Sequence, residues 1–178
     1  MKEGLKNSRK EELAAVVIKA LKEFQPLPGR MRLIKGIKNT LIVDDTYNAA
    51  LLSMEAALES LKIFENRRKI VVLGDMLEIG EYAPEAHKKI GKKASEIADL
   101  IFTVGSRAKF IAEEAIKQGF PENKIFQFMV SDDAAIKAQE EIKENDVILI
   151  KGSRAMKMEK VVKEIMAEPD KAKELLVA

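Results

Sequence analysis

The stretch KIVVLGDM, residues 69–76, decides the fold class of this 178-residue chain. Its first five residues are too apolar for a strand with one solvated face, and the run ends at a glycine and an aspartate. Two more runs of this kind follow, LIFTV at 100–104 and DVILI at 146–150. Such buried strands are typical of a parallel sheet that helices cover on both sides.

Strand and helix patterns alternate outward from this stretch. The expected strands are 31–34 and 40–43, joined by a turn near Gly36, then 69–73, 100–104, a weaker 124–128, and 146–150. The expected helices are 51–64, 84–98, 108–117, 132–142 and 156–166, and the tail from Ala167 is expected to be a frayed helical end. This order predicts an α/β fold with a Rossmann-like, mostly parallel sheet, helices on both faces and an N-terminal hairpin.

A linker is predicted at QPLPG, residues 25–29, because two prolines stop the preceding helical pattern. That pattern covers residues 8–24 and has Ser8 as a candidate N-cap. The boundary therefore separates a lone helix from everything that follows, and the length fits one globular domain.

Composition excludes several classes of function. The chain has no cysteine and one histidine, which excludes disulfides, thiolate catalysis and a multi-histidine metal centre. The 31 basic and 29 acidic residues are interleaved and only 9 residues are aromatic, so no nucleic-acid partner is expected. No apolar run approaches the roughly 20 residues of a membrane span, and the start MKEGLKNSRK is unlike a secretory signal, so a soluble cytoplasmic chain without membrane insertion is expected.

Polar residues follow four of the predicted strands: DDTYN at 44–48, GDM at 74–76, GSR at 105–107 and KGSR at 151–154. The carboxyl ends of parallel strands share one edge, where loops and helix N-termini gather around ligands. The sequence therefore predicts a polar, anionic ligand at that edge. Taken singly, each of these residues also has a purely structural explanation: the glycines allow sharp turns, and Ser106 and Ser153 cap helices.

Other candidate sites are weaker. Asp75, Glu78 and Glu81 are better read as solvated carboxylates than as metal ligands, and His87 as a surface or hydrogen-bonding histidine than as a general base. The only Gly-Lys pair, Gly91-Lys92, lacks the other residues of a phosphate-binding loop. The sequence thus predicts a ligand-binding edge without a phosphate cradle of its own.

Four motifs, in order, give the chain a resemblance to a known family. They are PGRM at 28–31, LIVDDTYNA at 41–49 with Ser53-Met54, VLGDMLEIG at 72–80 with His87, and KGSR at 151–154 with Met158-Glu159. Together they resemble the C-terminal domain of Mur ligases, in particular those that add D-alanyl-D-alanine to UDP-N-acetylmuramoyl-tripeptide. By this likeness, residues 1–28 resemble the closing helix of a central ATPase domain plus linker, and residues 29–178 the C-terminal domain.

The resemblance implies an ATP-dependent reaction in which an acyl phosphate forms, with Mg²⁺ neutralising the phosphates, and the dipeptide amine attacks it. ATP and Mg²⁺ would be held mainly by the missing central domain, so the chain alone is expected to be inactive. The C-terminal domain would position substrates and stabilise charge, and would supply no catalytic nucleophile.

Site residues carry over from the matching motifs. The resemblance assigns Arg30, Asp45 and Asn48 to ATP, with an exposed Arg30–Asp45 ion pair as the structural alternative. It assigns a second set to the D-alanyl-D-alanine substrate, with the last three of them at its carboxylate: Asp75, His87, Lys151, Ser153 and Arg154. A helix that begins near Ser153 would favour an anion there, and Arg154 would add a forked contact.

One departure and two alternatives remain. Ala50 stands where the family usually has a second asparagine after the tyrosine, which permits a non-catalytic binding or regulatory module derived from the ligase domain. A phosphoacceptor receiver domain would use Asp44, Asp45, Asp75, Ser106 and Lys151. Against it, Asp75 follows the very next strand of the alternating series, and the hairpin and linker before Asp44 have no place in a receiver.

Overall fold

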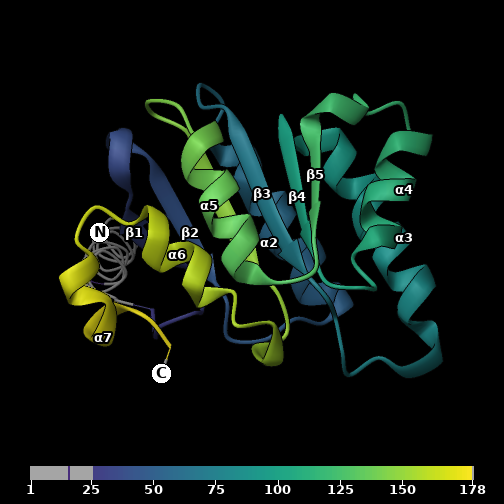
Figure 1. Ribbon diagram of the computed structural model, residues 1–178, viewed down its shortest axis with the longest axis horizontal. Helices are drawn as coiled ribbons and strands as arrows, with labels where there is room; N and C mark the ends of the chain where they lie inside the picture. Colours follow the sequence, from purple (N-terminus) through teal and green to yellow (C-terminus); the bar gives the residue numbers. More distant parts are fainter. Residues whose placement is uncertain (1–15, 17–25, 178) are drawn as a thin grey trace, which may run out of the picture.

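A six-stranded sheet forms the centre of the molecule, in the order β1-β2-β6-β3-β4-β5 (Figure 1). The computed structural model describes Val16 and residues 26–177, so all but Val16 of the helix expected at 8–24 lies outside the described residues. The strands are β1 (Arg32–Lys35), β2 (Leu41–Asp45), β3 (Lys69–Gly74), β4 (Leu100–Val104), β5 (Ile125–Phe128) and β6 (Val147–Lys151). Only the β1–β2 pair is antiparallel, which confirms the mostly parallel sheet and its hairpin.

Helices cover both faces of the sheet, as expected. One face carries α2 (Leu51–Ser60), α3 (Ala83–Ile97) and α4 (Lys109–Lys117), and the other carries α5 (Ser131–Glu141), α6 (Glu159–Ile165) and α7 (Ala172–Leu175). Short 3-10 turns lie between them, at Ile37–Asn39, Leu61–Ile63, Gly80–Tyr82, Glu122–Lys124, Arg154–Met156 and Pro169–Lys171. Of the helices described, none is both long and apolar enough to cross a bilayer.

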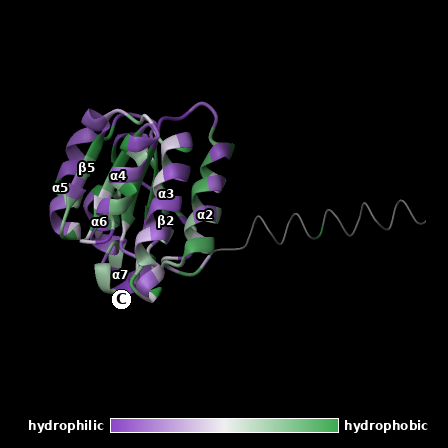
Figure 2. Cartoon of the chain, turned by 90° about the vertical axis from the view of Figure 1, so that its right-hand side faces the viewer, coloured by the Kyte–Doolittle hydropathy of each residue, from purple (hydrophilic) through white to green (hydrophobic). Residues whose placement is uncertain are grey.

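Two apolar clusters, one on each face of the sheet, hold these layers together. Neighbouring residues of a strand point to opposite faces, so Ile70 and Val72 join the cluster under α5 and α6, while Val71 and Leu73 join the one under α2 and α3. All four side chains are fully buried. Hydrophobic strands accordingly lie between helices whose outer surfaces are hydrophilic (Figure 2).

The last strand, β6, lies in the middle of the sheet and pairs in parallel with both β2 and β3. Its final residue, Lys151, is opposite Asp45 of β2 and Leu73 of β3. This register brings the carboxyl ends of three strands together.

Two sequence-based expectations near the C-terminus are wrong. The helix expected at 156–166 begins only at Glu159, because Lys157 adopts a left-handed conformation with φ of 52°. The tail is not frayed: Ala167 donates its amide to the Lys35 carbonyl at 2.9 Å. Leu176 is buried in the apolar cluster under α5 and α6, and that burial holds the tail in place.

Candidate functional site

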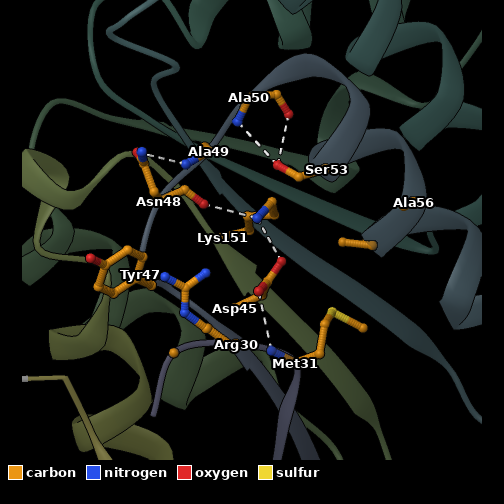
Figure 3. A pocket seen from close by; sticks show the side chains of 12 residues that line it. Arg30, Met31, Asp45, Tyr47, Asn48, Ala49, Ala50, Ser53, Ala56 and Lys151 are labelled. Carbon is orange, nitrogen blue, oxygen red and sulfur yellow. Dashed lines mark hydrogen bonds and ion pairs between the residues drawn. The ribbon is translucent and has the colours of Figure 1, made fainter. Parts of the chain in front are cut away.

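A cavity of about 460 Å³ opens at the carboxyl ends of β2 and β6, beside the start of α2 (Figure 3). It lies at the edge where the sequence predicted a ligand. Its wall is formed by Gly29, Arg30, Met31, Asp45, Tyr47, Asn48, Ala49, Ala50, Ser53, Ala56, Ala57 and Lys151. The three residues that the resemblance assigns to ATP all belong to this wall.

An ion pair between the buried Lys151 and the partly buried Asp45 forms the floor of the cavity. The Lys151 ammonium donates to Asp45 Oδ2 at 2.6 Å and to the Asn48 carbonyl at 2.9 Å, and Lys151 is only 2% exposed. Asp45 Oδ1 also accepts the Met31 amide at 3.1 Å. Lys151 thereby ties β6 to the end of β2 and to the loop after it, and removing the Asp45 charge would leave the Lys151 ammonium buried without a counter-charge.

Arg30 and Asn48 lie at the mouth of the cavity. The Arg30 guanidinium stacks over the Tyr47 ring, 4.0 Å from its centroid, while Asp45 pairs with Lys151. The Arg30–Asp45 ion pair considered from the sequence is therefore not the arrangement found. Asn48 donates a long hydrogen bond to Glu78 at 3.4 Å and accepts the Ala49 amide at 2.8 Å.

A second group of polar residues holds the segment Asp75–Leu77, which follows β3. The amide of Met76 donates to His87 Nε2 at 3.0 Å, and that of Leu77 donates to Ser153 Oγ at 2.9 Å. Arg107 donates to the Leu77 carbonyl at 3.0 Å. Side chains from three separate segments thus satisfy this backbone, and we call the arrangement the 75–77 clamp.

Asp75 belongs to the same clamp through its own carboxylate. Its Oδ1 accepts the amides of Arg107 and Ala108 at 3.1 and 2.6 Å, just before α4. Gly105 has φ of +113°, and a Cβ there would lie 2.4 Å from the Asp75 carboxyl carbon. Asp75 is 3% exposed, so its place in the structure is that of a cap for the turn into α4.

His87 is fully buried, so of the two readings drawn from the sequence the hydrogen-bonding one is correct and the surface one is wrong. Its Nδ1 lies 2.6 Å from the Ala83 carbonyl, and its Nε2 accepts from Met76. This pattern requires a neutral ring with its proton on Nδ1. Burial lowers the pKa of His87 and so favours the same neutral form, although the Ala83 hydrogen bond and the Asp75 charge partly offset this effect.

The KGSR segment is divided between the two groups rather than forming one anion site. Lys151 belongs to the cavity, whereas the Ser153 hydroxyl bonds to Leu77 and does not cap a helix. The element after Ser153 is a three-residue 3-10 turn, not the helix start expected from the sequence. Arg154 donates to Glu159 at 2.8 Å, and its side chain is 39% exposed.

Sequence reasoning missed the Asp45–Lys151 pair and the contact of Tyr47 with Arg30. The Asp45–Lys151 pair follows from the parallel pairing of the strands expected at 40–43 and 146–150, and the sequence alone does not show that these two strands are neighbours. Across the part of the chain that the structure describes, no group of three or more His, Cys, Asp and Glu side chains could hold a metal ion.

Comparison with known sequences places most of the chain in one family. Residues 29–154 match the family described as "Mur ligase, glutamate ligase domain". UDP-N-acetylmuramoyl-tripeptide–D-alanyl-D-alanine ligase of Bacillus subtilis is 37% identical over 142 residues, which cover 79% of this chain and 31% of the relative. The ligase of the same name from Escherichia coli is 30% identical over 80% of this chain and 30% of its own length. The chain spans about a third of the length of these curated relatives.

Solved structures agree with this assignment. MurF from Acinetobacter baumannii superposes with a TM-score of 0.67 at 30% identity, over 82% of this chain and 32% of that one. The MurF ligase of Thermotoga maritima in complex with ADP gives a TM-score of 0.66 at 26% identity, over 85% of this chain and 33% of that one.

Proposed function

Because the chain belongs to the Mur ligase family, we propose that it is the C-terminal domain of the ATP-dependent ligase that adds D-alanyl-D-alanine to UDP-N-acetylmuramoyl-tripeptide in peptidoglycan synthesis. In this proposal residues 29–178 are the domain, and residues 1–28 join it to a central ATPase domain. The chain contains no phosphate-binding loop, so the proposal leaves ATP hydrolysis to residues outside this sequence. The proposed location is the cytoplasm, where nucleotide-linked precursors are made.

The observation that carries the proposal is the cavity floored by Asp45 and Lys151. Its volume of about 460 Å³ lies within the ordinary range of small-molecule sites, roughly 300–1,000 Å³. Asp45 accepts two hydrogen bonds, and a carboxylate has about four acceptor positions, so it retains capacity for ribose hydroxyls. Arg30 supplies a cation for the phosphates, and Asn48 an amide at the mouth.

Within this reaction the domain binds, orients and excludes water. When the ligase is loaded, ATP supplies the phosphoryl group that activates the tripeptide carboxylate for attack by the dipeptide amine. Among the described residues no group of three or more His, Cys, Asp and Glu side chains could hold a metal ion, and Asp45 is already paired with Lys151, so the proposal leaves Mg²⁺ mainly to the central domain and the ATP phosphates.

For the dipeptide we propose a contact at Arg154 rather than at all five residues drawn from the sequence. Lys151 faces the nucleotide cavity, whereas the other three residues belong to the 75–77 clamp: Asp75, His87 and Ser153. The Arg154 side chain is partly exposed beside the clamp, and its five N–H groups allow a substrate carboxylate to share it with Glu159.

Separate kinetic constants for the two substrates test this division. In a complete ligase carrying these residues, Asp45→Ala should raise the KM for ATP and leave the KM for D-alanyl-D-alanine nearly unchanged, while Arg154→Ala should do the reverse. We expect Arg154→Ala to weaken the dipeptide by roughly tenfold to a hundredfold. An unchanged dipeptide KM would reduce Arg154 to a structural role, and ATPase activity of this chain alone would contradict the proposal.

A further inference from the structure

Asp44 precedes the cavity residue Asp45 and has no part in the proposed function. Its carboxylate is fully buried and accepts three hydrogen bonds. Oδ2 accepts the Gly29 amide at 3.0 Å, and Oδ1 accepts the Thr46 amide at 3.3 Å and the Thr46 hydroxyl at 2.7 Å. With no exposed surface, Asp44 is unable to touch a ligand in the cavity.

The Gly29 amide that Asp44 holds belongs to the turn that carries Arg30. In that turn the Arg30 amide donates to the Leu27 carbonyl at 3.1 Å, and the Gly29 carbonyl accepts the Tyr47 amide at 3.0 Å. Gly29 has φ of +69°, and a Cβ there would lie 2.8 Å from the Tyr47 nitrogen. Both polar backbone groups of Gly29 are therefore fixed by residues 44–47, the end of β2 and the start of the loop after it.

The Arg30 side chain is fixed by the same segment. Its guanidinium lies 4.0 Å from the centroid of the Tyr47 ring, on the side of the cavity (Figure 3). Arg30 is thus held at its backbone, through Gly29 and Asp44, and at its charged end, through Tyr47. Its position relative to the cavity floor is set before any ligand arrives.

We propose that Asp44 and Tyr47 are positioning residues that hold Arg30 toward the anionic part of a nucleotide in the cavity. This inference rests on the proposed nucleotide site. It requires the ionised form of Asp44, because all three of its contacts are hydrogen-bond donors. Burial raises the pKa of Asp44, as does the neighbouring Asp45 carboxylate, and the hydrogen bonds from Thr46 and Gly29 lower it, so the donors offset part of the cost of keeping this charge inside the protein.

The test measures ADP binding to the 178-residue chain by two-dimensional NMR titration in magnesium-free buffer. Tyr47→Leu should weaken ADP roughly two- to fivefold, the size of an exposed cation–π contact, while Tyr47→Phe should keep the wild-type affinity. Asp44→Asn should weaken ADP about tenfold, the equivalent of one charge-assisted hydrogen bond.

The matched control is Asp146→Asn. Asp146 is also buried, accepts the Lys143 amide at 2.6 Å and pairs with Arg68, but it lies at the opposite end of β6. Its loss should lower stability without changing ADP affinity. Equal effects of the Asp44 and Asp146 variants on ADP, or wild-type affinity in Tyr47→Leu, would overturn the positioning role.

Hydrogen exchange at the Gly29 amide tests the anchoring of the turn by Asp44 separately from the proposed nucleotide site. Asp44→Asn should accelerate exchange there and leave the Val147 amide, at the far end of the sheet, unchanged. If the wild-type chain does not bind ADP, the nucleotide site fails, and accelerated Gly29 exchange would then still support the anchoring of the turn. Unchanged Gly29 exchange would overturn the anchor itself.

Discussion

Protonation of His87 should break the 75–77 clamp, and His87→Gln isolates that effect. In the folded protein Nε2 accepts the Met76 amide, so a protonated ring would place two donors against each other. The charged groups facing the ring are Asp75, which favours protonation, and Arg107, which opposes it, but burial has the largest effect and lowers the pKa of His87. Glutamine does not titrate and offers an oxygen near the position of Nε2.

The sign follows from proton linkage. Because the pKa of His87 is below its ordinary 6.5 in the folded state, the unfolded chain takes up this proton first as the pH falls. The His87 contribution to the free energy of unfolding is therefore complete above pH 6.5 and declines as the pH drops through that value. The loss between pH 7 and pH 5.5 is at most about 1.3 kcal/mol, the value for a ring that stays neutral throughout in the folded state.

Urea unfolding at both pH values measures this loss. With an m-value of about 2 kcal/mol/M, the wild-type midpoint should fall by up to about 0.6 M more than that of His87→Gln on going from pH 7 to pH 5.5. Comparing the pH-dependent change in midpoint between the two proteins cancels the packing cost of the substitution and the titration of every other group. Equal pH dependence in the two proteins would refute the assignment of a neutral, accepting His87.

Two further pairs of substitutions test the cavity floor and the clamp by equilibrium unfolding. Asp45→Asn should cost about 3–5 kcal/mol of unfolding free energy by leaving the buried Lys151 ammonium without a counter-charge, and the double variant with Lys151→Met should lose less than the sum of the two single variants; additive losses would show that the pair is not coupled. Gly105→Ala should destabilise the protein more than Gly119→Ala. Both glycines have positive φ, but a Cβ at Gly105 would collide with Asp75, whereas a Cβ at Gly119 would face open space. Equal losses of stability would mean that the clamp adjusts to the added Cβ without cost.

The fold was predictable because its signals are local. Apolar strands such as LIFTV and DVILI alternate with amphipathic helices, and each pattern can be read within a few residues. The helix boundary at Glu159 was not predictable, since the left-handed turn at Lys157 depends on how Met158 packs against Gly74 and Gly152. Burial of Leu176 likewise depends on the apolar cluster that forms only when the helices pack on the sheet.

The site was predictable as an edge of the sheet but not as contacts. Sequence order places Lys151 beside Ser153 and Arg154, and this suggested a shared anion. The strand order instead puts Lys151 opposite Asp45, 106 residues earlier, and turns Ser153 toward the loop after β3. Which polar groups meet each other, and which stay open to a ligand, is decided by that long-range pairing.

The central place of β6 also has a consequence for how the protein is made. Ribosomes release the β1–β2 hairpin and the β3–β4–β5 segment first, yet in the described sheet the strands of these two parts pair only through β6, whose residues 147–151 come last among the strands. A chain interrupted before residue 147 would carry two half-sheets with open hydrogen-bonding edges, the kind of surface that invites aggregation. Because the same strand delivers Lys151, the cavity floor is completed in the same step that closes the sheet, so an unfinished domain has no such cavity to offer a ligand.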